Sequence, residues 1–141
     1  MNQISQHPHT TSHDIAPRDG RIAYIQSCWH KEIVDQCRAA FVVELRRLGR
    51  PEHLTDFFEV PGAFEIPLQA KLLARTNRYV AIVAAGSVVD GGVYRHEFVS
   101  DAVISALMRV QSETDVPIIS AVLTPQRFCY QRREFHPKPS D

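Results

Sequence analysis

The chain has 141 residues, which suits one domain with a single hydrophobic core and leaves little room for two. Its 16 basic and 16 acidic residues balance, so the bulk charge gives no indication of binding to nucleic acid or to an anionic membrane. No apolar run approaches the roughly 20 residues of a membrane span, and the N-terminal segment lacks the apolar middle of a signal peptide. We therefore expect a cytoplasmic protein with no membrane partner.

Residues 1–19 are rich in His, Ser, Thr and Pro and contain almost nothing apolar. Ordering such a segment would cost conformational entropy without burying apolar surface, so we expect a disordered N-terminal tail. Histidines 7, 9 and 13 fall in this tail, and solvated side chains are a better interpretation than metal ligands. We expect no metal site.

The pattern from residue 21 onward predicts seven elements in chain order. A short β-prone run at 21–27 precedes a helix over 33–48, which Gly49 and Pro51 end. A strand over 54–60 then precedes a helix over 63–77, which tolerates Pro67 only in its first turn. The apolar run at 79–85 is typical of a buried parallel strand, 98–110 carries a helical apolar stripe, and 116–123 is a further buried strand.

Strict alternation of strands and helices predicts the α/β fold class. We expect a three-layer αβα sandwich around a mostly parallel four-stranded sheet with flavodoxin-like topology, spanning residues 20–125 and followed by an irregular polar tail at 126–141. Ligands of such sheets bind beyond the carboxyl ends of the strands. Three loops should therefore meet at one edge, namely 27–30, 60–67 and 86–96.

Chemically versatile side chains fall in these three loops. Gly91 and Gly92 lie between a strand and a helix start, which is either a tight turn or a phosphate site. Arg95 and His96 favour the second interpretation, because arginine pairs with phosphate oxygens and histidine moves protons near neutral pH. Trp29 either covers the edge of the core or provides a stacking surface, and Glu65 either stabilises a helix start or binds ligand hydroxyls.

These motifs resemble the 6,7-dimethyl-8-ribityllumazine synthase family. The resemblance rests on Trp29 in the first loop, on "PGAFEIP" at 61–67 and on "GSVVDGGVYRHEFV" at 86–99, and it runs from about Arg21 to Pro125. The Trp and the "DGGxYRHEFV" wording are most like the decameric, type II subclass. The resemblance implies a riboflavin-pathway transferase that condenses 5-amino-6-(ribitylamino)uracil with 3,4-dihydroxy-2-butanone 4-phosphate, without a redox cofactor. It also implies a homo-oligomer built from pentameric rings, with active sites between neighbouring subunits.

The resemblance also implies roles for individual residues. Trp29 would stack on the pyrimidine, and Gly92 and Val93 would receive the phosphate. The ribityl chain and the ring edge would be held by Ala63, Phe64, Glu65, Ser87, Val88 and Val89. His96 lies one residue later than the usual family histidine, which aligns with Arg95, so we interpret His96 as the acid/base and Arg95 as the phosphate partner. Ser120 stands where many members carry an aromatic residue that reaches a neighbouring subunit's site.

The C-terminal part departs from the family. After Thr124 the family continues through a long helical region with a phosphate-binding basic residue, whereas residues 126–141 are polar, basic and proline-containing. We expect apolar surface on one face of the sheet to be left uncovered as a result. The alternative function is a truncated, non-catalytic paralogue that binds lumazine or flavin. A generic nucleotide-binding domain is disfavoured, because neither a Walker loop nor GxGxxG follows the first strand.

Overall fold

The structure is a computed structural model that describes residues 20–89 and 95–124. The predicted tails at 1–19 and 126–141 and the predicted phosphate residues Gly92 and Val93 lie outside the described residues.

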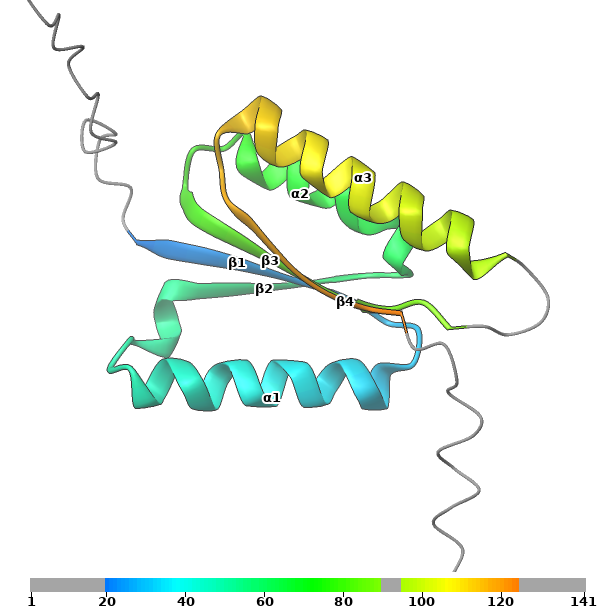
Figure 1. Ribbon diagram of the computed structural model, residues 1–141. Coiled ribbons are helices and arrows are strands. Elements are labelled where there is room, and N and C mark those ends of the chain that lie inside the picture. Colours follow the sequence, from blue (N-terminus) through cyan, green and yellow to red (C-terminus); the bar gives the residue numbers. More distant parts are fainter. Residues whose placement is uncertain (1–19, 90–94, 125–141) are drawn as a thin grey trace, which may run out of the picture.

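Parallel strands and helices alternate through the described chain, as the sequence predicts (Figure 1). The strands are β1 (Arg21–Ser27), β2 (Thr55–Val60), β3 (Tyr79–Ser87) and β4 (Ile118–Leu123), and the helices are α1 (Lys31–Arg47), α2 (Ile66–Ala74) and α3 (His96–Thr114). Two short 3-10 turns, Glu52–Leu54 and Ala63–Glu65, precede β2 and α2. The sheet order is β2-β1-β3-β4, and every strand pair in it is parallel. The predicted α/β fold class is confirmed.

The predicted helix over 63–77 differs from the observed one at both ends. Its first residues form the 3-10 turn Ala63–Glu65, and the α-helix begins at Ile66 with Pro67 in its first turn. Proline is tolerated there because the first turn needs no donated N–H. The helix already ends at Ala74, and Asn77 then takes a left-handed φ of 57° that reverses the chain toward β3. The predicted helix is therefore correct in kind and too long.

The helices form two layers, one on each side of the sheet. Helices α2 and α3 pack together over one face, and α1 covers the other (Figure 1). The larger core lies under α2 and α3 and includes Ile25, Ile66 and Ile82, each 0% exposed. Burying an isoleucine side chain contributes about 1.5–3 kcal/mol, so Ile66, the one of the three that belongs to α2, helps to hold this helix on the sheet. That placement determines where the turn before α2 lies.

The face beneath α1 has the smaller core. Tyr24, Val34, Val83 and Ala85 form it, and Ala121 of β4 packs at its border. Alternation along β4 places Ile119 and Leu123 on the same face as Ala121. Their side chains are 57% and 39% exposed, so α1 leaves apolar surface uncovered at the β4 edge. Within residues 20–89 and 95–124, no helix is long and apolar enough to cross a bilayer.

Candidate functional site

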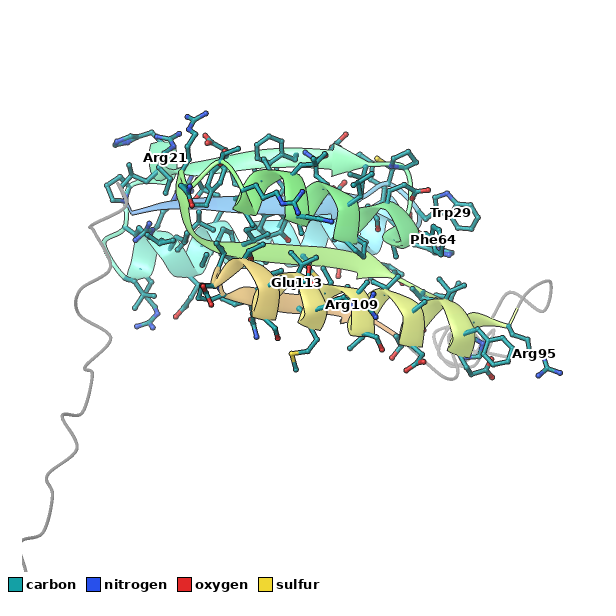
Figure 2. All side chains as sticks on the ribbon, turned by 90° about the horizontal axis from the view of Figure 1, so that it is seen from above. Arg21, Trp29, Phe64, Arg95, Arg109 and Glu113 are labelled. Atoms are coloured by element: carbon teal, nitrogen blue, oxygen red, sulfur yellow. The ribbon has the colours of Figure 1, made fainter. Side chains whose placement is uncertain are left out.

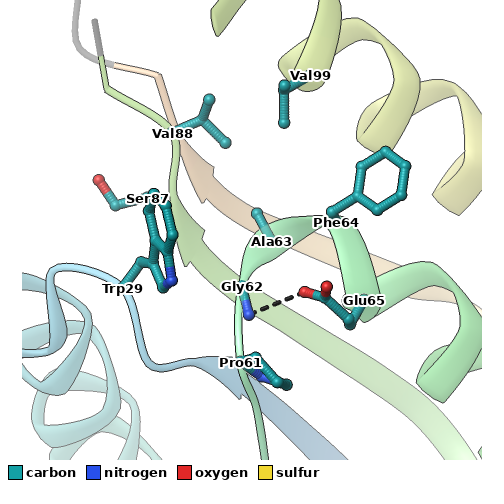
Figure 3. A pocket seen from close by; sticks show the side chains of 9 residues that line it. All are labelled: Trp29, Pro61, Gly62, Ala63, Phe64, Glu65, Ser87, Val88 and Val99. Carbon is teal, nitrogen blue, oxygen red and sulfur yellow. Dashed lines mark hydrogen bonds between the residues drawn. The ribbon is translucent and has the colours of Figure 1, made fainter. Parts of the chain in front are cut away.

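A cavity of about 430 Å³ lies at the carboxyl edge of the sheet, where the loops after β1, β2 and β3 meet (Figure 3). Its volume falls in the range of small-molecule sites, which are mostly apolar with a few convergent polar groups. The cavity is lined by Trp29, Pro61, Gly62, Ala63, Phe64, Glu65, Ser87, Val88 and Val99.

The loop between β1 and α1 presents Trp29 at the mouth of this cavity. The Cys28 amide donates to the Val60 carbonyl at 2.9 Å, which ties the loop to the end of β2. His30 then adopts left-handed backbone angles, φ 52° and ψ 47°, and turns the chain directly into α1. Between these two constraints the indole is left 59% exposed. An exposed flat ring on a held loop can stack on a planar heterocycle.

A polar network fixes the start of α1 next to this loop. Lys31 Nζ lies 3.0 Å from Asp35 Oδ1 and 3.4 Å from Glu59 Oε1, and Gln26 also donates to Asp35. The hydrogen bond from Gln26 holds the pKa of the Asp35 carboxyl below its ordinary value, and Lys31 lowers it further. Asp35 in turn raises the pKa of Lys31. Both groups therefore stay charged through the neutral range and hold α1 against β1 and β2.

The turn after β2 supplies the opposite wall. Ala63 is buried, whereas Phe64 is 69% exposed and projects beside the cavity toward α3 (Figure 3). The Gly62 amide donates to Glu65 Oε2 at 2.9 Å. The turn sits directly on β3, where a β-carbon on Gly86 would lie 3.5 Å from the Ala63 β-carbon. Glycine at this position thus allows the turn to approach the sheet closely.

The end of β3 forms the back of the cavity. The Val88 amide donates to the Leu123 carbonyl at 2.8 Å, which extends the sheet ladder past Ser87. Ser87 and Val88 are 4% and 2% exposed. The Ser87 hydroxyl points away from Phe64 and Val99 (Figure 3) and has no hydrogen-bond partner within the described ranges. Ser87 and Val88 therefore contribute mainly backbone and apolar surface to the cavity.

The predicted catalytic pair stands at the start of α3. Arg95 is exposed at the outer end of the helix (Figure 2), and its guanidinium lies 5.4 Å from the centre of the Phe98 ring. The His96 side chain is 14% exposed, with Nδ1 3.6 Å from Glu97 Oε2. Neither residue lines the cavity, but His96 precedes Val99, which does, by about one helical turn.

The structure thus brings together most of the predicted binding residues. Trp29, Ala63, Phe64, Glu65, Ser87 and Val88 share the cavity. Val89 is buried beside it without lining it, and Ser120 lies on β4, where its hydroxyl accepts from the Val122 amide at 3.4 Å. That Ser120 belongs to a neighbouring subunit's site stays a prediction.

Sequence reasoning did not include three lining residues, Pro61, Gly62 and Val99, among the site residues. Pro61 and Gly62 open the "PGAFEIP" motif, so their signal was present in the sequence, whereas Val99 reaches the cavity through the packing of α3 over the turn. In the described part of the chain, no group of three or more His, Cys, Asp or Glu residues could hold a metal ion.

A parallel sheet with a mostly apolar cavity at its carboxyl edge, flanked by an indole and a carboxylate, is the arrangement typical of α/β proteins that bind small molecules. The comparison with known families is more specific. The family model described as 6,7-dimethyl-8-ribityllumazine synthase matches residues 19–134, and the chain belongs to this family. The match extends past Pro125, where the resemblance seen in the motifs ends.

Curated relatives agree with the family. The 6,7-dimethyl-8-ribityllumazine synthase 2 of Pseudomonas syringae pv. tomato is 63% identical over 108 residues, which cover 77% of this chain and 64% of the relative. The 6,7-dimethyl-8-ribityllumazine synthase of Rhodococcus erythropolis is 63% identical over 108 residues, covering 77% of this chain and 70% of the relative. The 6,7-dimethyl-8-ribityllumazine synthase 2 of Bradyrhizobium diazoefficiens is 56% identical over 123 residues, which cover 86% of this chain and 72% of the relative. The matched part of the chain therefore spans only about two thirds of the length of these relatives.

Proposed function

We propose that this chain condenses 5-amino-6-(ribitylamino)uracil with 3,4-dihydroxy-2-butanone 4-phosphate to 6,7-dimethyl-8-ribityllumazine. The observation that carries this proposal is the single cavity shared by Trp29, the Ala63–Glu65 turn and Val88. Family membership and the names of the relatives support the same activity. The proposal requires neither a metal nor a redox cofactor.

The cavity suits the pyrimidine substrate. Trp29 would stack on the ring, and the apolar back wall at Val88 would exclude water from its edge. Glu65 is exposed beside the cavity, where a carboxylate can accept hydrogen bonds from ribityl hydroxyls. Ala63 and Phe64 complete the proposed pyrimidine subsite, and Val89 is buried beside it without lining the cavity.

The reaction needs positioning of two substrates and several proton transfers. One amine condenses with the ketone to an imine, phosphate is eliminated, and the second amine closes the ring with loss of water. We assign the proton transfers to His96, since histidine is the side chain that most often serves as a general acid or base. Arg95, Gly92 and Val93 would hold the phosphate.

We also propose a homo-oligomer made of pentameric rings, specifically the type II decamer. Phe64, Leu68 and Leu72 follow one another every four residues, so they share one side of the turn and α2, and they are 69%, 63% and 53% exposed. Phe98 of α3 adds a further side chain that is 65% exposed. Apolar surface of this extent marks an interface in soluble proteins, and its position beside the cavity suits sites between subunits. The cytoplasmic location stays a prediction from composition.

A turnover assay with both substrates tests the proposed activity. The full chain is expected to form lumazine, which absorbs and fluoresces in the visible range, and His96→Ala is expected to lose about 10²- to 10⁴-fold in kcat, the usual contribution of a general acid/base. His53→Ala is the matched control, because His53 is an exposed histidine in the turn before β2. It should leave the rate unchanged.

Binding measured alongside separates the two candidate roles. Trp29 is the single tryptophan, so quenching of its fluorescence reports ligand at the cavity. Quenching by riboflavin or lumazine without turnover in a folded oligomer would reject catalysis and favour the non-catalytic paralogue. An unchanged rate in His96→Ala would reject His96 as the proton carrier.

A further inference from the structure

The turn between β2 and α2 is closed by two reciprocal hydrogen bonds. The Gly62 amide donates to Glu65 Oε2 at 2.9 Å, and the Glu65 amide donates to the Gly62 carbonyl at 3.3 Å. Figure 3 shows the carboxylate folded back over the turn toward Gly62. The second of these hydrogen bonds is the ordinary backbone bond of a 3-10 turn, and the first is the contact by which a Glu three positions into a helical turn commonly reaches back to the backbone N–H before it. The Gly62 and Glu65 amides thus both have partners.

Glycine at position 62 leaves room for the carboxylate and is not required by the backbone conformation. Its φ of −143° and ψ of 176° are extended angles that any residue adopts. A β-carbon there would lie 3.1 Å from Glu65 Oε2, closer than an ordinary contact. Without a side chain at residue 62 the carboxylate reaches the backbone N–H in place, whereas a β-carbon would make it shift by a few tenths of an ångström.

The two residues enclosed by this pair of hydrogen bonds are the wall residues Ala63 and Phe64. Their positions depend on the turn keeping its closed form, because Phe64 is 69% exposed and has little packing of its own to hold it. On the side that faces the sheet, Ala63 packs closely on β3, because residue 86 is a glycine. On the opposite side, the Glu65 carboxylate holds the turn through its hydrogen bond from the Gly62 amide.

We infer that Glu65 is a positioning residue of the cavity, in addition to any contact it makes with a ligand. Its Oε2 holds the turn that carries Ala63 and Phe64 in the shape that accepts the pyrimidine. No hydrogen bond among the described residues uses Oε1, so that oxygen is left for one ligand hydroxyl. The ligand part of this inference rests on the proposed function, and the positioning part does not.

Hydrogen exchange at the Gly62 amide tests the positioning role without any substrate. Exchange, measured by NMR on the full chain, is expected to speed up at least about tenfold in Glu65→Ala, because the N–H loses its acceptor. Glu65→Gln should retain slow exchange, since an amide oxygen also accepts. Glu113→Ala, which removes an exposed carboxylate near the far end of α3 (Figure 2), should leave the rate unchanged. Equal exchange in Glu65→Ala and the unmodified chain would overturn the inference.

Steady-state kinetics test the consequence for the ligand. Glu65→Ala is expected to raise KM for the ribitylaminopyrimidine several-fold more than Glu65→Gln, with KM for the keto phosphate unchanged. Gly62→Ala keeps the carboxylate but crowds it, and it should also speed exchange at residue 62. If Glu65→Gln raised KM as much as Glu65→Ala, the carboxylate would act only on the ligand and the positioning role would be wrong. A chain without turnover would reject the proposed function and leave the exchange result standing.

Discussion

Gly86 offers a sharp test of how the cavity is built. A methyl group at this position on β3 would lie 3.0 Å from Ser27 Oγ and 3.2 Å from Ile66 Cδ1. Both distances are shorter than ordinary van der Waals contacts, so Gly86→Ala must displace the Ser27 hydroxyl, the end of the Ile66 side chain, or both. Ser27 is 0% exposed, and its hydroxyl has no hydrogen-bond partner in the described part of the chain.

The magnitude follows from two opposing effects. Overpacking a filled core costs about 1–3 kcal/mol. Replacing glycine by alanine at negative φ returns roughly 0.4–1 kcal/mol by reducing the entropy of the unfolded chain. Overpacking is the larger effect, so we expect Gly86→Ala to lower the free energy of unfolding by about 1 kcal/mol. Ser27→Ala removes the nearest atom, and the double variant should recover about 1 kcal/mol relative to the sum of the single changes.

A double-mutant cycle measures this coupling. The unmodified chain, the two single variants and the double variant are unfolded in urea at one fixed protein concentration, since assembly shifts apparent stability. Circular dichroism follows the helices, and Trp29 fluorescence follows the cavity edge. Additive effects, within about 0.3 kcal/mol, would refute the claim that Ser27 and Gly86 share the space beneath Ala63.

Three further changes have definite expected outcomes. Tyr24 is 1% exposed, burial raises its pKa to about 12, and its hydroxyl has no partner in the described ranges. Tyr24→Phe should therefore leave the free energy of unfolding, measured in urea, unchanged or raise it by up to about 1 kcal/mol. A clear loss of stability would mean that the hydroxyl has a partner. The hydrogen bond from Arg21 lowers the pKa of Asp56, which is thus lower in the folded than in the unfolded chain. The ionised carboxylate therefore stabilises the fold at pH values above the pKa of Asp56 in the unfolded chain, and this stabilisation is lost as pH falls through the lower pKa of the folded chain. Asp56→Asn should accordingly have a lower free energy of unfolding than the unmodified chain at neutral pH, and the two free energies should become equal in acid. Leu72→Glu should reduce the oligomer mass measured by light scattering, and an unchanged mass would exclude α2 from the interface.

The fold could be predicted from the sequence because its signals are local. The run at Tyr79–Ala85 is short and continuously apolar, as in a strand buried on both faces, and the stripe along α3 has the period of a helix. Alternation of strands and helices then fixes a parallel sheet. Loop positions follow from that topology, which is why Trp29, Glu65 and Val88 were expected at one edge.

The details that sequence reasoning missed depend on contacts distant in the chain. The 3-10 turn at Ala63–Glu65 depends on a side chain reaching back to Gly62 and on a glycine in β3, neither of which has a periodic signature. Val99 enters the site because α3 crosses above the turn, and packing between helices is not written in either sequence segment alone.

Titration of the full chain with 6,7-dimethyl-8-ribityllumazine, followed by Trp29 fluorescence, tests the central claim most directly. The cavity account predicts saturable quenching that Val99→Phe abolishes by filling the cavity, while Val43→Phe, a change at an exposed valine of α1, leaves quenching intact. Absence of quenching in the unmodified chain, or equal quenching in both variants, would contradict it.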